Sequence, residues 1–453
     1  MEQTIAAIST PVGQGAIALL RMSGESSVDI AEKVFRSASG SVRELPQRVQ
    51  VLGDVVDTEG NRIDQVLLTV FRAPASYTGE DTVEISSHGG ILVTAAVLEA
   101  LVEAGARPAE PGEFTQRAFL NGKMDLTQAE AVMDLIGART SLALRAANRQ
   151  LEGKLGLRVN LLREQLLAAL AHLEAYIDFP EEGIDPDSSQ SICERLIEVS
   201  TVARALIDTA EEGRILREGL IVVIAGLPNA GKSSLLNLLL GFDRAIVSHS
   251  AGTTRDTIEE MINIRGIPVR LVDTAGLRKA KEQVEREGVC RAKREVEGAD
   301  LVLHVQDSSL DQGSQDDPVA FAGTDSAEVQ RILVLNKVDL GIHPSWEEVE
   351  GVRISCVQQR GVESLREAIF NVAGLVGFDL GSEMIAVNAR HRDCLERACR
   401  HTEKAVELLR AGESPEFVAI DLREALDAVG SIVGKVDTEE LLGELFSSFC
   451  IGK

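Results

Sequence analysis

The spacing of hydrophobic and polar residues divides the chain into three successive patterns. In residues 1–118, short runs rich in Val, Ile, Leu and Thr predict strands, and segments with apolar residues three or four positions apart predict helices. The expected strands are 4–10, 16–22, 66–71 and 82–86, and the expected helices are 26–35 and 91–104. Because Gly and Pro interrupt these short elements repeatedly, the region is predicted to be an α+β domain.

From residue 126 the pattern becomes helical. Residues 126–176 contain no proline and are dense in strong helix formers, and helical spacing resumes over 192–216. Five apolar runs then alternate with polar or helical stretches, at 220–225, 269–272, 301–305, 332–335 and 352–354. This alternation predicts a doubly wound parallel sheet. Helical spacing returns at 392–409, 416–429 and 438–449.

The order helical, α/β, helical has two interpretations. Either three domains follow one another, or residues 126–216 and 388–453 form one helical domain into which the α/β module is inserted. Insertion at an exposed loop is well tolerated, because the ends of a domain often lie close together. The pattern alone leaves both open.

A phosphate-binding motif follows the first strand of the α/β module. Residues 226–233 read GLPNAGKS, the G-x-x-x-x-G-K-[ST] pattern, and they precede an apolar helix predicted at 234–240. The glycines let backbone N–H groups surround a β-phosphate, and the helix N-terminus adds partial positive charge. Lys232 would contact the β- and γ-phosphate oxygens, and the Ser233 hydroxyl would bind Mg²⁺.

Three further motifs follow in the order found in GTPases: TTRD at 253–256, DTAG at 273–276 and NKVD at 336–339. Thr254 would complete the Mg²⁺ shell, and Asp273 would hold the ion through water. The Asp339 carboxylate would accept the guanine N1–H and exocyclic amine, a donor pair that adenine lacks. Ser355 and Cys356 end the last strand, at the position of the loop that backs the guanine base. The motifs therefore predict GTP binding.

Leu277 stands directly after DTAG, where Ras-like enzymes use Gln to orient the attacking water. Leucine forms no side-chain hydrogen bond, so another group must position the nucleophile. The nearest downstream carboxylates are Glu282, Glu285 and Glu287. The same charged stretch, 278–287, also fits a solvated helix surface, so the residues alone do not choose among them.

Composition narrows the function classes. The 453 residues suggest about three domains, and 46 Lys and Arg against 71 Asp and Glu give a formal charge of −25. This balance excludes a general nucleic-acid binder, so any RNA or phosphate must be held by a local site.

The six scattered cysteines predict neither a zinc ribbon nor a disulfide framework. With no apolar signal segment or apolar span of about 20 residues, a cytoplasmic location is expected.

Over its full length the chain resembles the tRNA modification GTPase MnmE (TrmE) family. The segments that carry the resemblance are PNAGKSSLLN (228–237), AGTTRD (251–256), DTAGLR (273–278), PGEFTQRAFLN (111–121), AYIDFP (175–180) and the terminal FSSFCIGK (446–453). The resemblance implies an N-terminal folate-binding and dimerisation domain over 1–118 and a Ras-like G domain over 217–380. The G domain would be inserted in a discontinuous helical domain of residues 119–216 and 381–453.

The resemblance also implies an activity and partners. The protein would be a potassium-dependent GTPase and a homodimer that forms a hetero-oligomer with the FAD-dependent protein MnmG (GidA). The pair would add an aminomethyl or carboxymethylaminomethyl group at C5 of the wobble uridine of certain tRNAs. The one-carbon unit would come from a tetrahydrofolate derivative, either 5-formyl- or methylene-tetrahydrofolate.

Site residues follow from the motifs and the resemblance together. The GTP site comprises Asn229, Ala230, Gly231, Lys232, Ser233, Ser234, Ser248, His249, Ser250, Ala251, Gly252, Thr253, Thr254, Asp273, Thr274, Ala275, Gly276, Asn336, Lys337, Asp339, Ser355 and Cys356. Mg²⁺ is assigned to Ser233 and Thr254. The resemblance places K⁺ at Asn229, Ser248, Ser250 and Thr253, and folate at Arg21, Glu84, Lys123 and Lys453. The expected catalytic residues are Lys232, Asp273, Glu285, which aligns with the water-orienting glutamate of the family, and Cys450.

Two other functions fit parts of the pattern. One is a nucleotide-switched GTPase of ribosome assembly, but such proteins usually carry a basic RNA-binding domain, which a charge of −25 does not supply. The other is a folate-dependent aminomethyl transferase in which the G domain only regulates.

Overall fold

The computed structural model describes residues 3–178, 187–243, 259–273, 295–314, 329–374, 385–435, 439–447 and 449–452. The chain divides into two compact units, the first formed by residues 1–133 with 429–453 and the second by residues 134–428. No helix in the described ranges is long and apolar enough to span a bilayer. Among the predicted site residues, Glu285, Lys453 and the stretches 248–254 and 274–276 lie outside those ranges.

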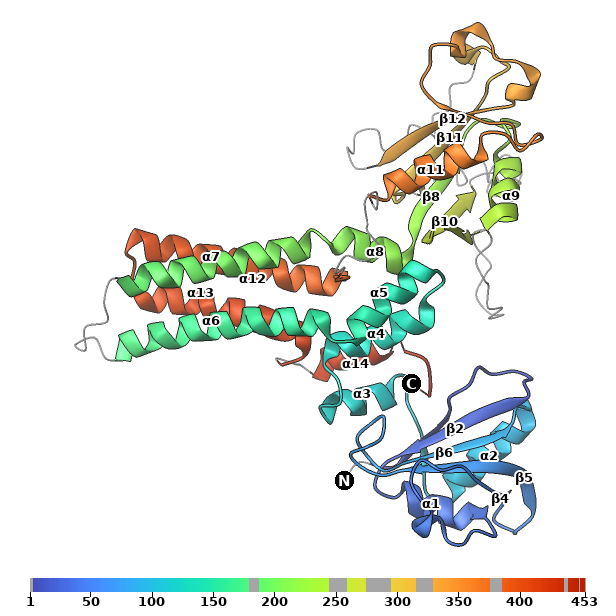
Figure 1. The fold of residues 1–453 in the computed structure, drawn as a ribbon, viewed down its shortest axis with the longest axis vertical. Coiled ribbons are helices and arrows are strands. Elements are labelled where there is room, and N and C mark those ends of the chain that lie inside the picture. Colours follow the sequence, from blue (N-terminus) through green and yellow to red (C-terminus); the bar gives the residue numbers. More distant parts are fainter. Residues whose placement is uncertain are drawn as a thin grey trace, which may run out of the picture. The chain divides into compact units, whose positions relative to one another are not determined.

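The first unit is built on a seven-stranded sheet (Figure 1). Its strands are β1 (Ile5–Ile8), β2 (Ile17–Ser23), β3 (Phe35–Arg36), β4 (Val51–Val56), β5 (Arg62–Phe71), β6 (Thr82–His88) and β7 (Arg107–Pro108). They lie in the order β3-β4-β5-β6-β2-β1-β7, and every neighbouring pair is antiparallel except β1 and β7. Helices α1 (Ser27–Val34) and α2 (Ile91–Glu103) complete the predicted α+β fold. The interrupted sequence of β4, VLGDVV, explains why it was not predicted.

The two faces of this sheet bury different side chains because residues alternate along each strand. Leu20 and Met22 of β2 pack with Val83 and Ile85 of β6 in the same cluster as residues of α1 and α2. The intervening residues, Arg21 on β2 and Glu84 on β6, are register partners on the opposite face. A second apolar cluster, formed by Ile5, Ala7, Ala109, Phe114 and Tyr77, accompanies that face.

A buried ionic network fixes α3 (Glu113–Leu120) in the first unit. The Arg117 side chain is 3% exposed, and its guanidinium donates to Glu113 at 2.9 Å, to Glu80 and to the Gln3 carbonyl. Burial by itself raises the pKa of Glu113, but hydrogen bonds from Arg107, the Glu110 amide and Arg117 outweigh it and lower the pKa. Removing one partner of such a network leaves a buried charge uncompensated, which costs about 3–5 kcal/mol.

The second unit contains four long helices: α6 (Lys154–Asp178), α7 (Asp187–Ile207), α12 (Ala389–Ala411) and the first part of α13 (Pro415–Val433) (Figure 1). Helix α7 packs along both α6 and α12. The buried Asp421 of α13 accepts hydrogen bonds from His401 and Lys404 of α12. These helices come from both sides of the α/β module in the sequence.

The predicted helical run 126–176 is divided into α4 (Leu126–Gly137), α5 (Ser141–Leu151) and α6. Gly137 ends α4, and the Thr140 hydroxyl caps α5 by accepting the Ala143 amide at 3.2 Å. Gly153 has a φ of +79° between α5 and α6, a conformation that glycine adopts without strain. Local turn residues therefore override a continuous helical composition.

The last helix, α14 (Glu439–Ser447), returns to the first unit. Its residues Leu442 and Phe446 are buried with Leu126 and Ala129 from the first turns of α4. The end of the chain is therefore packed against a segment that precedes the α/β module.

The α/β module enters and leaves the helical region at neighbouring points. The Thr209 hydroxyl, just before α8 (Ala210–Glu218), donates to the Ile385 carbonyl at 3.0 Å. One turn later, a Cβ on Gly213 would lie only 2.7 Å from the Val387 carbonyl oxygen. Because these segments flank the module, the structure has the inserted arrangement rather than three domains in series.

The module contains a six-stranded sheet in the order β13-β12-β11-β8-β10-β9. Its strands are β8 (Leu220–Ala225), β9 (Glu259–Ile264), β10 (Ile267–Asp273), β11 (Leu301–Asp307), β12 (Gln330–Asn336) and β13 (Val352–Arg353), and its helices include α9 (Lys232–Asp243) and α11 (Val362–Val372). All five predicted strands are present and mutually parallel. The additional edge strand β9 pairs antiparallel with β10 through Arg265 and Gly266, both at positive φ.

Candidate functional site

Those parts of the predicted nucleotide motifs that the structure describes meet at one edge of the six-stranded sheet. Strands β8, β10, β11, β12 and β13 are parallel, so their carboxyl ends lie together. After β8 the chain forms β9 and β10 on one side of that strand, and then β11 on the other. Ligands of open α/β sheets bind outside the carboxyl ends at such a switch point.

The loop after β8 depends on glycine at two positions. Gly226 has a φ of +148°, and a Cβ there would lie 2.3 Å from the Val305 carbonyl oxygen. Gly231 has a φ of +101°, and its Cβ would lie 2.2 Å from the Asn336 side-chain nitrogen. The two glycines therefore let the loop approach Val305 and Asn336, a packing requirement that adds to the phosphate-binding role predicted for them.

Lys232 begins α9 and is 6% exposed. Its ammonium donates to the carbonyl oxygens of Gly226 and Leu227, both at 2.8 Å. The Lys232 side chain therefore lies over the phosphate loop that directly precedes it in the sequence. Ser233 and Ser234 are exposed in the first turn of α9, where backbone N–H groups and the helix dipole favour an anion.

Asn336 joins the phosphate loop to the base-recognition segments. It ends β12 and is 2% exposed. Its side-chain amide donates to the Ala230 carbonyl at 2.9 Å, and its side-chain oxygen accepts the Cys356 amide at 3.3 Å. One residue therefore connects three predicted segments that are far apart in the sequence.

The base-recognition side is also organised by hydrogen bonds. The Ser355 hydroxyl, which is buried, donates to the Asp339 carboxylate at 2.5 Å. Lys337 contacts Asp307, at the end of β11, with 2.6 Å between Nζ and Oδ2. Burial raises the pKa of the Cys356 thiol to about 11, so this thiol is neutral near pH 7.

Asp307 was missed by the sequence reasoning. Burial by itself raises its pKa, but hydrogen bonds from Lys337 and Ser309 outweigh burial and lower it. The sequence did contain a signal for Asp307, because this carboxylate follows a predicted parallel strand. That strand, β11, is the neighbour of β12, which ends in Asn336. We therefore add Asp307 to the site as the residue that holds Lys337.

Part of the predicted nucleotide site lies outside the described residues. Asp273 ends β10 opposite Ile224 of β8, which puts its backbone at the same sheet edge. The remaining predicted residues that lie outside the described ranges are Ser248, His249, Ser250, Ala251, Gly252, Thr253, Thr254, Thr274, Ala275, Gly276 and Glu285. The residues that the structure brings together are thus the phosphate loop, Asn336, Lys337, Asp339, Ser355 and Cys356.

In the first unit, two of the predicted folate residues form one cluster. The Arg21 guanidinium donates to one Glu84 carboxylate oxygen from Nε at 2.9 Å and from Nη2 at 2.7 Å. It also lies 5.2 Å from the Tyr77 ring centroid and 5.8 Å from that of Phe114. The two aromatic residues were missed because only the fold brings them to this face.

Lys123 is tied to the loop that carries Tyr77. Its ammonium donates to the Pro74 carbonyl at 2.9 Å, and its aliphatic stem lies beside Gly79. The neighbouring Asn121 donates to the Thr78 carbonyl at 2.8 Å. The structure therefore connects Lys123 to the Arg21 cluster through one loop, whereas Lys453 lies outside the described ranges.

The segment that carries Cys450 belongs to the first unit and is hydrogen-bonded to residues near the start of the chain and before α3. The Cys450 carbonyl accepts the Gly112 amide at 3.4 Å, and the Gly452 carbonyl accepts the Ser9 hydroxyl at 3.1 Å. Gly452 has a φ of +91°, and a Cβ there would lie 2.6 Å from the Ile8 carbonyl oxygen. Cys450 itself is exposed and has a free thiol.

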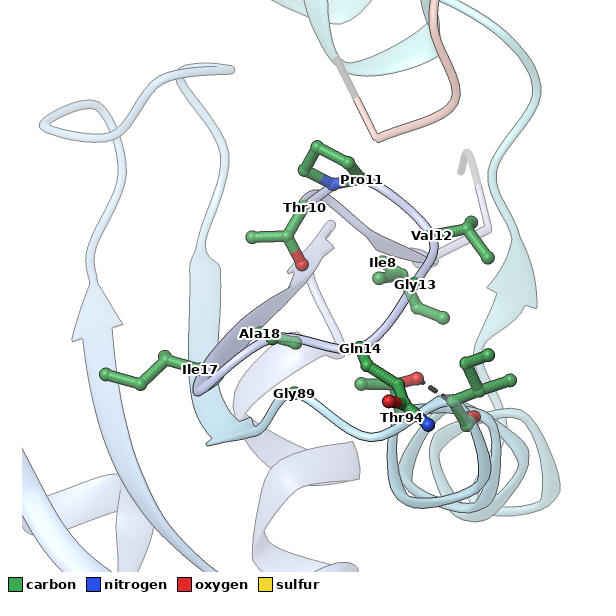
Figure 2. Close-up of a pocket in the computed structure, with 12 residues that line it drawn as sticks. Ile8, Thr10, Pro11, Val12, Gly13, Gln14, Ile17, Ala18, Gly89 and Thr94 are labelled. Carbon is green, nitrogen blue, oxygen red and sulfur yellow. Dashed lines mark hydrogen bonds between the residues drawn. The ribbon is translucent and has the colours of Figure 1, made fainter. Parts of the chain in front are cut away.

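A cavity of about 310 Å³ lies beyond the carboxyl end of β1, beside this segment (Figure 2). Its lining comes from the loop between β1 and β2 and from the start of α2: Ile8, Thr10, Pro11, Val12, Gly13, Gln14, Gly15, Ile17, Ala18, Gly89, Ile91 and Thr94. The Gly15 amide donates to the Gly89 carbonyl at 2.8 Å, which joins two of its lining segments. None of Arg21, Glu84 and Lys123 lines it.

Gly226→Ala is expected to weaken GDP binding at least tenfold. The added Cβ would meet the Val305 carbonyl, and a non-glycine residue at this φ costs about 1–3 kcal/mol. Titration of GDP into the purified variant measures the effect. Gly241→Ala is the matched control, because Gly241 lies in α9 with nothing within 4 Å of its added Cβ. An unchanged GDP affinity in Gly226→Ala would contradict the close-approach argument.

Comparisons with known proteins cover the whole chain. The family "GTP-binding protein TrmE N-terminus" matches residues 4–123, and the family "MnmE helical domain" matches residues 126–450. The tRNA modification GTPase MnmE of Akkermansia muciniphila is 52% identical over 100% of this chain and 99% of its own length. The proteins of the same name from Aquifex aeolicus and Clostridioides difficile are 45% and 43% identical, each over 100% of both chains.

Among solved structures, the G domain of the T. maritima FeoB iron transporter is 25% identical over 34% of this chain and 98% of its own, with a TM-score of 0.24. The strand order and the position of the phosphate loop after β8 define the fold of the α/β module. The end-to-end identity to the curated relatives is decisive by itself. The chain belongs to the tRNA modification GTPase MnmE family.

Proposed function

We propose that this protein hydrolyses GTP and that its hydrolysis cycle serves the modification of tRNA. The observation that carries the proposal is the Asn336 side chain, which joins the phosphate loop to the base-recognition segments in a chain with full-length family identity. Lys232 would contact the β- and γ-phosphates, and Asp339, held by Ser355, would select guanine. Asp307 holds Lys337 at the same edge.

Mg²⁺ fits the residues of this site. The Ser233 hydroxyl is exposed in the first turn of α9, beside the amides that would face the phosphates. Thr254 would supply a second hydroxyl, and Asp273 would act through a water. A bound Mg²⁺ neutralises charge on the phosphate oxygens.

Potassium and Glu285 would complete the hydrolytic chemistry. Asn229 is exposed at a φ of +66° in the phosphate loop, which leaves its amide oxygen accessible to a cation. With Ser248, Ser250 and Thr253 it would hold K⁺ beside the β- and γ-phosphates, where other GTPases place an arginine. Glu285 would orient the attacking water, directly or through a second water, because Leu277 cannot.

GTP hydrolysis is therefore expected to be faster in potassium than in sodium, and Asn229→Ala should remove the difference. Steady-state phosphate release in the two salts at equal ionic strength measures this. Equal wild-type rates would contradict the cation assignment.

Glu285→Ala should slow hydrolysis in the same phosphate-release assay, while the GDP affinity measured by titration stays nearly unchanged. A large loss of GDP affinity would instead indicate a structural role for Glu285.

The first unit would bind the one-carbon donor. A carboxylate suits the N–H edge of the pterin of a folate, and a basic side chain suits its glutamate tail. Because Arg21 donates to Glu84 at 2.7 Å, these two residues would face the same end of 5-formyl- or methylene-tetrahydrofolate, the pterin, while Lys123 and Lys453 would hold its tail. The Tyr77 and Phe114 rings keep the Arg21 guanidinium in place.

Arg21→Met is expected to weaken 5-formyltetrahydrofolate binding tenfold or more, because one charged hydrogen bond contributes about 1.5–3 kcal/mol. Isothermal titration with that folate measures the effect. Arg43→Met is the control, since Arg43 forms an exposed ion pair with Asp29 in the same unit. Wild-type affinity in Arg21→Met would place the folate elsewhere.

The proposed substrate position is the wobble uridine, modified at C5 with an aminomethyl or carboxymethylaminomethyl group. The redox step would belong to the flavin of the partner MnmG (GidA). Cys450 is exposed on the C-terminal segment and would therefore be accessible at the modification site.

We also propose a homodimer through the first unit. Leu52 and Leu67 are register partners on β4 and β5 and are 57% and 36% exposed, which suits an apolar contact between copies.

Loss of the gene is expected to abolish the modified wobble uridine, and the intact gene should restore it. Mass spectrometry of tRNA nucleosides from the two strains makes the comparison. A Lys232→Ala gene should fail to restore the nucleoside, since the phosphate contact would be lost. Unchanged nucleoside levels in the deletion strain would reject the proposed function.

A further inference from the structure

Charge is distributed unevenly along this acidic chain. Residues 139–163 contain five arginines, one lysine and a single carboxylate, Glu152, although the whole protein has a formal charge of −25. We call these residues the basic segment. It covers α5, the tight turn at Gly153 and the first ten residues of α6. Such a local excess of one sign within a chain of the opposite sign is a candidate for a specific electrostatic contact.

Two arginines of the basic segment lie away from its buried apolar residues. Helix α5 buries Ala143, Ala146 and Ala147, while Arg145 is exposed. Arg139 is exposed just before the N-cap of α5. The guanidinium groups of Arg139 and Arg145 are therefore available to a ligand in solution.

These charges are less neutralised than those on another helix of the same unit. Within the described ranges, no carboxylate pairs with Arg139, Arg145 or Arg163, and Lys154 reaches Glu152 only at 3.7 Å. Helix α12, by contrast, carries four carboxylates beside its six basic residues, and two of those basic residues are paired, Arg392 with Glu396 at 2.7 Å and Lys404 with Asp421 at 3.0 Å. Exposed arginines in a segment with a single carboxylate favour an anionic ligand over an internal structural role, whereas the arginines of α12 stand among carboxylates of the same helix.

We propose that the basic segment binds the phosphate backbone of the tRNA substrate. This inference rests on the proposed function, which brings a polyanion to a protein whose overall charge repels it. The planar guanidinium donates two parallel hydrogen bonds to a phosphate, so arginine is the residue type best suited to this contact. The contact would position the tRNA without reading its sequence, and base recognition would take place elsewhere.

Exposed leucines in the same segment supply the competing interpretation. Leu144, Leu157 and Leu161 are 45%, 66% and 56% exposed, and they would suit an acidic protein partner. The observations favour RNA because the segment holds six basic residues against one carboxylate and because the substrate itself is an anion. A partner protein is therefore an outcome of the test.

The experiment compares R139Q/R145Q with the wild-type full-length protein, using an unmodified tRNA transcript with uridine at the wobble position. Dissociation constants are measured between 50 and 200 mM salt. Each lost phosphate contact should reduce the slope of log K against log salt by about 0.7–0.9, so we expect a total reduction of about 1.5. Affinity at 100 mM salt should fall about tenfold, with GTP hydrolysis unchanged.

The control is R400Q/R410Q, which makes the same change in net charge at two exposed arginines of α12. It should leave both the affinity and the salt slope at wild-type values. Wild-type tRNA binding by R139Q/R145Q, or an equal loss in the control, would overturn the inference. Unchanged tRNA binding together with weaker association with the flavoprotein partner would overturn it and assign the segment to protein contact.

Nucleoside mass spectrometry separates this inference from the function on which it rests. If the wild-type gene restores the modified uridine in a deletion strain but R139Q/R145Q binds tRNA normally, only the basic segment assignment fails. If the wild-type gene does not restore the nucleoside, the proposed function itself fails.

Discussion

The hydrogen bond from the Asn336 side chain to the Ala230 carbonyl is the contact on which the nucleotide site depends. It fixes the phosphate loop against β12, and the side-chain oxygen of the same residue accepts the Cys356 amide of the base-recognition segment. Gly231 must lack a side chain for Asn336 to come this close. The phosphate loop and the base-recognition segment are therefore both hydrogen-bonded to one buried residue.

The elements that local patterns specify were predicted well from the sequence. The phosphate loop is one, because strand, glycines, lysine and helix follow one another within residues 220–243. The same holds for the five parallel strands, which are mainly apolar although Arg270, His304 and Arg353 stand within three of them. Strand β4 was missed because Gly53 and Asp54 interrupt it, although Gly53 is required there by the ring of Phe35. Strand β9 was missed because only its pairing with β10 distinguishes it from a loop.

Contacts between distant segments could not be predicted from the residues alone. The pairing of Lys337 with Asp307 depends on two strands separated by a crossover. The two rings around Arg21 come from different elements, the loop before β6 and α3. The formal charge of the whole chain was also a poor guide to RNA binding, because the total of −25 conceals the arginine-rich stretch of α5 and α6. Averages over a chain say little about the surface that a ligand meets.

The contact between Thr209 and Ile385 has an evolutionary consequence. Because the chain departs for the nucleotide module and returns to the host helices at almost the same place, the module occupies the position of an elongated surface loop. A gene segment encoding a ready-folded GTPase could enter an ancestral helical protein there without disturbing the packing of α7 on α12. Conversely, a short linker across that gap would remove the nucleotide module and leave the packing of α7 on α12 in place.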